Sequence, residues 1–381
     1  MPSRFNIMIR DNQLVPVSRG DFKDRAYKVG WTTLLPGGCG DLAWRFRHPR
    51  RTTPIEIGFN FRVQVSYGGR VVWSGRIEDA FAGTDKDGDY WEVVAKGDGI
   101  VVDDQDATTV NVRNTTTSQI VTDVITAINT PNTLIDASSI TATGFTISNT
   151  ADVNLTSMRA ADRINWAAEF GDSSNRQQLW YVYPDDNGDR RFTFKPRPTT
   201  PDLEGYAKDF EAVRWGFKGR QVYNRVNVDY TGGRSTANDT TLQGAGPDGY
   251  GIIRSYTVSV PELTNAGDAA QLAATLLALV KTAKMTAQPM TMKANAVLYN
   301  SSGDYVAPWE VRAGQLFYFR DADADDSGPA GTLTFRNSFL IVGTAWDEDG
   351  QTLTMTPESY DSELSLMVAR SRALLAGLHQ V

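Results

Sequence analysis

The stretch that most constrains the fold covers residues 59–99, which read as three consecutive antiparallel strands. From Phe61 to Val65, apolar residues alternate with polar ones, which is the period of a strand with one buried face. Gly68-Gly69 supplies the positive φ of a tight turn, and the glycine-containing turn at 85–89 reverses the chain again. We therefore predict an antiparallel meander, with a kink or bulge at Ser74-Gly75.

The same plan returns between Ser338 and Glu358. An apolar strand meets Gly343, continues through Trp346, turns at residues 347–350 and comes back over 352–356. Repetition of one supersecondary unit is typical of duplication. We therefore predict an α+β, mainly β chain that contains two related small antiparallel β-barrels. The alternative, that any two hairpins look alike, stays open at this point.

Length and composition bound the class of protein. The chain has 381 residues, enough for two to four domains, and its 41% hydrophobic and 10% aromatic content is typical of a folded globular protein. No apolar run has the length of a membrane span, and the N-terminus lacks the apolar segment of a signal peptide, which predicts synthesis in the cytoplasm. The net charge of −7 argues against a general nucleic-acid binder.

Between the two meanders, helical and hairpin patterns predict an insertion. One amphipathic helix is capped by Thr117 or Ser118 and runs to about Asn129, and a second opens at Thr156 or Ser157 and is closed by Gly171. A clear hairpin follows, with aromatic-rich strands on either side of the turn at 185–188.

These patterns predict four parts of the chain. A longer helix, capped by Asn265, is predicted over 266–284, within the third part at 206–360. The parts are a first β-barrel over 1–105, completed by about 206–230; an inserted α/β domain over 106–205; a second β-barrel over 206–360; and a C-terminal helix over 361–381.

Residues with catalytic or metal-binding chemistry are scarce. His48 and His379 are the only histidines, Cys39 is the only cysteine, and no nucleotide-binding or zinc motif occurs. The acidic run 321–326 begins like a calcium loop but lacks its glycine and places Thr332 where the bidentate glutamate belongs, so a solvated loop is favoured. We predict no catalytic residue, no cofactor and no metal site.

Two candidate interaction surfaces remain. The first is a basic cluster. We favour its interpretation as a solvated loop or a salt-bridged protein interface over a contact with nucleic acid. The second is the apolar face of the predicted C-terminal helix, which docks either on another subunit or on its own domain. Their residues are Arg45, Arg47, Arg50 and Arg51 in the first, and Leu364, Met367, Leu374 and Leu375 in the second.

Several segments, taken in order, carry a resemblance. They are GGRVVWSGRIED, MRAADRINWAAEFG, LWYVYPDDNGDRRFTFKPRP, VYNRVNVDY, AGDAAQLAATLLALVKTAK and IVGTAWDEDGQTLTMTPES. As an order of elements over nearly the whole chain, they resemble the baseplate or tail-tip hub proteins of tailed bacteriophages and related contractile injection machines. No single motif among them is invariant, and the resemblance does not separate contractile from non-contractile tails.

The resemblance implies a homotrimeric ring at the distal end of the tail tube, located in the virion after synthesis in the host cytoplasm. With two tube-like barrels in each protomer, a trimer would present six barrels to a six-fold tube. The trimer would thereby adapt the tube to a three-fold tip. The implied partners are the distal tail protein or tail-tube ring, the tape-measure protein, and a tail fibre, spike or tip protein. DNA would pass through the channel without sequence-specific binding, and no stable membrane insertion is implied.

Two other functions stay open. In a receptor- or glycan-binding β-protein, four tryptophans would serve as sugar platforms, although most of them fall in predicted strands and therefore in the core. These are Trp31, Trp73, Trp180 and Trp346. The other alternative is a cell-wall hydrolase built on paired carboxylates, whose spacing in space cannot be taken from the sequence.

Overall fold

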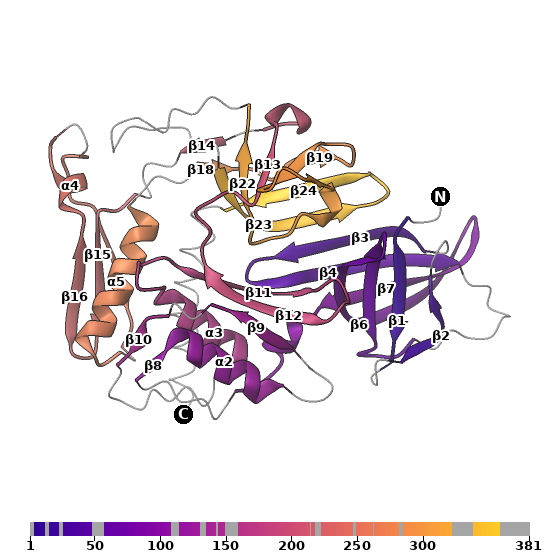
Figure 1. Cartoon of the computed structure of the whole chain (residues 1–381), viewed down its shortest axis with the longest axis horizontal. Helices are drawn as coiled ribbons and strands as arrows, with labels where there is room; N and C mark the ends of the chain where they lie inside the picture. The colour runs from indigo at the N-terminus through magenta and orange to yellow at the C-terminus, as the bar shows by residue number, and fades with distance from the viewer. Residues whose placement is uncertain are drawn as a thin grey trace.

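The computed structural model describes residues 4–11, 15–22, 26–47, 57–107, 114–129, 135–141, 144–148, 159–213, 215–217, 222–246, 249–261, 263–281, 285–321 and 338–358. The predicted C-terminal helix over 361–381 lies outside these ranges. The described chain is mainly β with packed helices, which confirms the predicted α+β class. Figure 1 shows two β units beside each other, with a mixed α/β region next to them.

The first β unit is a single antiparallel path of seven strands in the spatial order β2-β1-β5-β6-β7-β4-β3. Its strands are β1 (Asn6–Arg10), β2 (Pro16–Asp21), β3 (Ala26–Leu34), β4 (Gly37–Arg47), β5 (Arg62–Tyr67), β6 (Arg70–Asp85) and β7 (Gly88–Gly97). Strands β5, β6 and β7 are the predicted meander, with Gly68 and Gly69 at positive φ in the first turn.

The bulge predicted as one possibility at Ser74-Gly75 is not found there, because both residues pair in regular register. The pairing of β5 with β6 shifts between Val65 and Ser66, and β6 itself shifts against β7 after Ile77. A glycine is needed at position 75 for another reason, because a Cβ atom there would lie 2.0 Å from the carbonyl oxygen of Lys96.

The second β unit contains the predicted repeat near the C-terminus. Its strands are β13 (Leu203–Gly205), β19 (Met290–Lys293), β20 (Leu298–Asn300), β21 (Tyr305–Val306), β22 (Leu316–Phe319), β23 (Ser338–Asp347) and β24 (Thr352–Pro357). Strand β24 pairs along one edge of β23, so β22 and β3 share the other edge. The first and second β units are therefore parts of one hydrogen-bonded sheet system.

The mixed region holds the helices and the predicted aromatic hairpin. Its elements are α1 (Ile100–Asp103), β8 (Thr115–Thr116), α2 (Thr117–Ile128), β9 (Asp136–Ile140), β10 (Thr146–Ile147), α3 (Ala160–Glu169), β11 (Gln178–Pro184), β12 (Arg190–Pro196), β15 (Arg225–Tyr230), β16 (Gly233–Asn238), α4 (Thr240–Gln243), β17 (Ser255–Ser259) and α5 (Ala266–Val280). A small sheet of β14 (Trp215–Phe217) and β18 (Met285–Ala287) lies between this region and the second β unit in the chain.

The helix caps follow from short polar side chains at the expected places. The Asn265 side chain accepts hydrogen bonds from the backbone N–H groups of Gly267 and Asp268, as predicted for the start of α5. Helix α2 is capped one residue earlier than predicted, by the Thr116 hydroxyl. Gly171, at φ 69°, follows the last turn of α3 as predicted.

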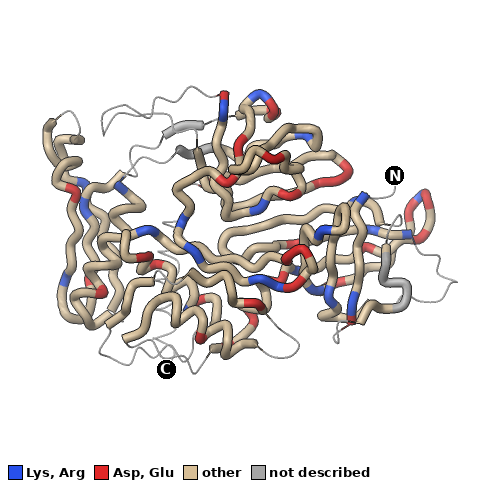
Figure 2. Tube along the Cα trace, in the orientation of Figure 1, with Lys and Arg blue, Asp and Glu red and all other residues tan. Residues whose placement is uncertain are grey.

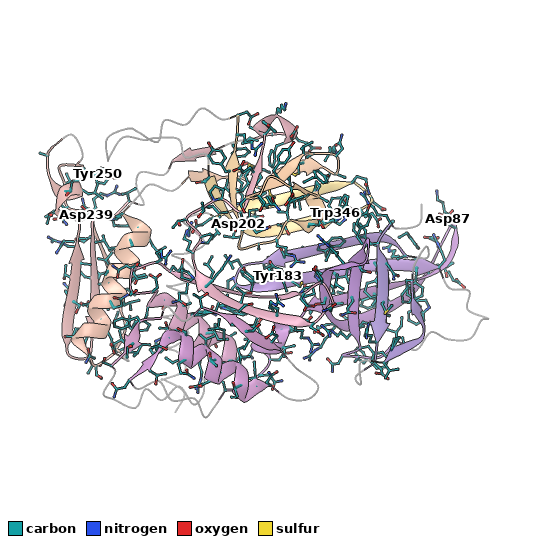
Figure 3. The ribbon with its side chains drawn as sticks, in the orientation of Figure 1. Asp87, Tyr183, Asp202, Asp239, Tyr250 and Trp346 are labelled. Carbon is teal, nitrogen blue, oxygen red and sulfur yellow. The ribbon has the colours of Figure 1, made fainter. Side chains whose placement is uncertain are left out.

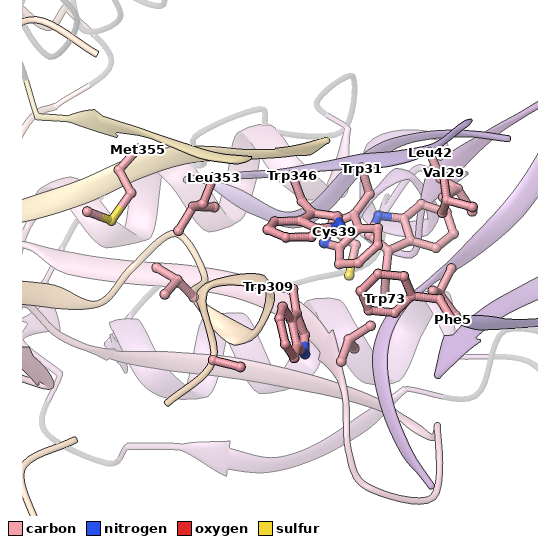
Figure 4. Packing of buried hydrophobic residues seen from close by; sticks show 14 of the residues in the cluster. Phe5, Val29, Trp31, Cys39, Leu42, Trp73, Trp309, Trp346, Leu353 and Met355 are labelled. Atoms are coloured by element: carbon pink, nitrogen blue, oxygen red, sulfur yellow. The ribbon is translucent and has the colours of Figure 1, made fainter. Parts of the chain in front are cut away.

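Two hydrophobic cores hold these elements. The first is shared by both β units and contains residues from Phe5 to Met355, part of which Figure 4 shows around Trp31 and Trp346. The second lies in the mixed region, where α2, α3 and α5 pack together with β11, β12 and β15. The division into domains at residues 105, 205 and 360 stays a prediction.

The parallel contact between β4 and β11 yields a test of the packing. Gly38 has a φ of 98°, and a Cβ atom there would lie 2.1 Å from the carbonyl oxygen of Val182. We expect Gly38→Ala to lower the free energy of unfolding by about 2–5 kcal/mol, because the cost of a positive φ for alanine and the cost of overpacking add. Gly68→Ala, at φ 57° with no atom within 4 Å, is the control and should cost only about 1–2 kcal/mol. Equal losses in urea unfolding would contradict the close approach.

Candidate assembly interface

The two β units are joined edge to edge by β3 and β23, and we call this contact the joint. Trp31 pairs with Trp346 in the antiparallel register. In the buried interior, the hydroxyl groups of Thr33 and Thr344 share a hydrogen bond of 2.6 Å. The Thr33 hydroxyl also accepts the backbone N–H of Ala313 at 2.8 Å, so it ties the loop before β22 to the same place. The joint is therefore held by backbone and side-chain hydrogen bonds together.

An aromatic cluster covers the joint. Phe5 meets Trp31 edge to face, with ring centroids 4.9 Å apart, and Trp309 lies 5.6 Å from Trp346. The Arg4 guanidinium lies over the Trp309 ring at 4.5 Å. Aromatic pairs of this kind contribute about 0.5–1.5 kcal/mol each beyond the area that they bury. The cluster therefore opposes any change in the angle between the two β units.

The four tryptophans considered as sugar platforms are buried. Trp31, Trp73, Trp180 and Trp346 are at most 3% exposed. The indole N–H of Trp180 donates to the side-chain oxygen of Asn165 at 2.8 Å, which satisfies it within the core. None of these rings has a free face for a sugar, as their positions in strands predicted.

The turn of the β11–β12 hairpin docks on β5 of the first β unit. The Gly188 carbonyl accepts hydrogen bonds from the Arg62 guanidinium and, at 3.0 Å, from the Gln64 amide. The alternating pattern of β5 predicts that both side chains face solvent, but they are 6% and 7% exposed. The hairpin covers this face of the strand. No local signal in the sequence marks the two residues, because their partner is more than a hundred positions away.

A buried ion cluster lies beneath this contact. Asp98, which is fully buried, accepts a hydrogen bond from Arg190 Nε at 2.6 Å and one from the Ser74 hydroxyl. The Arg62 guanidinium lies 3.6 Å from its second oxygen. Burial alone would raise the pKa of Asp98, but Arg190, Arg62 and the hydroxyl together lower it. Asp98 therefore stays ionised and fixes the hairpin to the first β unit.

The described part of the predicted basic cluster is paired with carboxylates. On β4, the Arg45 guanidinium contacts Glu92 at 2.5 Å, and Arg47 contacts Asp85 at 2.6 Å and the Gly88 carbonyl at 2.8 Å. The hydrogen bond from Arg47 lowers the pKa of Asp85. The positive charge of these two arginines is thus balanced on the surface, and a contact with a partner stays a prediction.

The remaining residues of the two candidate surfaces lie outside the described residues. These are Arg50, Arg51, Leu364, Met367, Leu374 and Leu375. Of the acidic run 321–326, only Asp321 is described, and its carboxylate accepts the backbone N–H of Ala207 at 2.6 Å. Within the described part of the chain, no group of three or more His, Cys, Asp or Glu residues is arranged to hold a metal ion.

A cleft of about 540 Å³ opens where the hairpin meets the loop before β22, and we call it the junction cleft. Tyr181, Tyr183 and Lys195 line it from the hairpin, and Asp202 and Arg312 line it from the other side. Figure 3 shows Tyr183 and Asp202 across from each other at this place. Three separate segments of the chain therefore meet at this cleft.

Comparison with known proteins assigns the fold. No family model and no curated protein matches the sequence. A 43 kDa tail protein of prophage MuSo2 from Shewanella oneidensis has a TM-score of 0.59 at 15% identity, with 94% of this chain and 99% of that chain covered. A tail protein from Neisseria meningitidis MC58 has a TM-score of 0.57 at 12% identity, with 94% and 97% covered.

A third solved structure agrees with these two. Prophage tail protein gp18 from Listeria monocytogenes EGD-e has a TM-score of 0.55 at 13% identity, with 97% of this chain and 99% of that chain covered. The match spans both β units and the mixed region at once. The chain therefore has the fold of phage tail proteins, as the order of its segments predicts.

The buried ion cluster yields a test by substitution and pH. Asp98→Asn leaves two buried guanidinium groups without their anion, and we expect it to lower the free energy of unfolding by about 3–5 kcal/mol at neutral pH. Because the folded pKa of Asp98 lies below its unfolded value of about 3.9, its stabilisation is present above that value and is lost as the pH falls.

The two proteins should therefore approach the same stability when urea unfolding is repeated at successively lower pH below about 4. Asp79→Asn, at an exposed position of β6, is the matched control and should leave the stability unchanged. A difference in the free energy of unfolding between wild type and Asp98→Asn that stays constant at every pH would contradict an ionised Asp98.

Proposed function

We propose that this chain is a structural hub protein of a phage tail tip or baseplate. The observation that carries the proposal is the fold match over 94–97% of this chain to three tail proteins that are themselves covered over 97–99% of their length. A match of this extent includes both β units, the joint and the mixed region. The function itself is inferred from fold, since identities of 12–15% alone carry no residue roles.

The proposed assembly is a homotrimeric ring at the end of the tail tube. Each copy contributes two β units, which we interpret as related tube-like barrels, so three copies present six such units to a six-fold tube. The joint supports this role, because a rigid connection through Trp31 and Trp346 holds both units of a copy in one orientation. The ring would thereby adapt a six-fold tube to a three-fold tip.

The proposed partners follow from this position in the particle. The distal tail protein or tail-tube ring would lie above, and a fibre, spike or tip protein below. The channel would hold the tape-measure protein and then pass DNA, for which a protein with a net charge of −7 offers few attractive phosphate contacts. No helix in the described residues is long and apolar enough to cross a membrane.

We propose a structural role and not an enzymatic one. The glycan-binding alternative loses its basis, because its four tryptophan platforms lie in the cores. For the hydrolase alternative, no observation in the described residues favours a pair of catalytic carboxylates.

Immunoelectron microscopy of phage particles tests the proposed location. An antibody against this chain should label the distal end of the tail in intact particles, and deletion of its gene should yield particles that lack the tip and do not infect. Supply of the wild-type chain from a plasmid should restore both label and infectivity. Label along the tube or on the capsid, or normal tips in the deletion strain, would overturn the hub function.

A further inference from the structure

A cleft of about 350 Å³ separates helix α5 from the second β unit, and we call it the α5 cleft. Ala278 and Leu279 line it from α5, and Phe339 and Leu340 line it from β23. Both walls are therefore apolar. The cleft lies at the C-terminal end of α5, where the mixed region and the second β unit face each other.

The chain enters this cleft at Glu358, the last described residue before the segment 359–381. Glu358 is only 4% exposed, and its backbone N–H donates to the Leu340 carbonyl at 2.8 Å. Its carboxylate is paired with the guanidinium of Arg197, which also lines the cleft. The segment 359–381 therefore begins between two apolar walls, in the same cleft as Ala278, and not at an outer surface.

Helix α5 is anchored on two of its sides. It packs on β15 and β16, and on another side the Gln271 amide and the Thr275 hydroxyl donate to the Phe170 carbonyl at 3.0 and 2.9 Å. The side opposite the sheet is exposed or partly exposed and ends at the cleft. Its residues, which share one face of the helix, are Gly267, Ala270, Ala274 and Ala278.

The composition of α5 is that of a covered helix. A helix at a protein surface normally carries charged residues on its outer side, and one that is apolar all round is buried. From Ala266 to Val280 the one charged residue is Asp268, which is 1% exposed. Figure 2 accordingly shows α5 in the colour of uncharged residues over nearly its whole length.

The segment 359–381 matches the exposed side of α5 in pattern and length. Its predicted helix has large apolar side chains on one face, which pack closely on a helix surface made of small residues. A helix over 361–378 would be about 27 Å long, against about 22 Å for the 15 residues of α5. The large side chains are Leu364, Met367, Leu374 and Leu375.

We propose that the segment 359–381 crosses the α5 cleft and packs as a helix along the exposed side of α5 in the same chain. Its start is fixed beside Ala278, so the effective concentration of its own α5 exceeds that of any other copy. The segment then ties the mixed region to the second β unit, as the pair of Arg197 and Glu358 does at its start. This inference goes beyond the proposed hub function and does not depend on it.

Thiol labelling of the full-length chain tests this contact. The native Cys39 is buried, so an introduced cysteine is the reactive one. Ala274→Cys should react with a maleimide at least about tenfold more slowly than Thr236→Cys, at an exposed position of β16. Addition of Leu374→Glu and Leu375→Glu should bring the rate of Ala274→Cys to within about twofold of that of Thr236→Cys, because carboxylates do not pack on an apolar helix face.

Matched controls separate the contact from the added charge. Ser365→Glu with Ala369→Glu, on the opposite face of the same predicted helix, should leave Ala274→Cys slow. Ala270→Cys serves as a second reporter if circular dichroism shows that Ala274→Cys is unfolded. Hundredfold dilution should not change the slow rate, because the contact lies within one chain.

Three results would overturn the inference. The first is a cysteine at position 274 or 270 that reacts as fast as Thr236→Cys. The second is slow labelling that persists with Leu374→Glu and Leu375→Glu. The third is slow labelling that is lost on dilution, which would place the segment on another copy of the chain. Antibody label at the tail tip tests the hub function alone, and neither experiment decides the other.

Discussion

The hydrogen bonds between β3 and β23 connect segments from opposite ends of the chain, and they set the position of one β unit against the other. Thr33 and Thr344, which share a hydrogen bond in the joint, are 311 positions apart in the sequence. The entropic cost of closing such a loop grows only slowly with its length. Burial of a large apolar surface together with the distant pairing can therefore offset this cost. The cluster around Trp31, Trp309 and Trp346 provides that surface. The whole mixed region is thereby inserted between two strands that lie side by side.

The mixed region needs a second attachment, because the joint alone does not orient it. The parallel pairing of β11 with β4 and the ion cluster around Asp98 provide this attachment. A buried ion pair is weak as a source of net stability, since desolvation offsets most of the attraction. Its hydrogen bonds are directional, however. Asp98 with Arg190 and Arg62 therefore selects one orientation of the hairpin from many that an apolar contact would tolerate.

The sequence predicts the elements well and their partners poorly. Period and turn chemistry locate the β5–β7 meander, the hairpin around 185–188 and the cap at Asn265, because these signals are local. The burial of Arg62 and Gln64 is missed, since it depends on a turn far along the chain. The bulge considered at Ser74-Gly75 is a similar case, because Gly75 is required by its close packing on Lys96, far along the strand path. The junction cleft is missed entirely, because three separate segments line it.

The joint also limits what an assembly of this chain can look like. A head-to-tail contact closes into a ring only if each copy turns the next by the same fixed angle. That angle is set within each copy, by the fixed relation between the two surfaces that contact its neighbours. In this chain the relation between the two β units is set by the pairing of β3 with β23 and by the loop that Thr33 holds at Ala313. In the proposed ring, a change in the packing of the buried aromatic cluster would change the angle between successive copies.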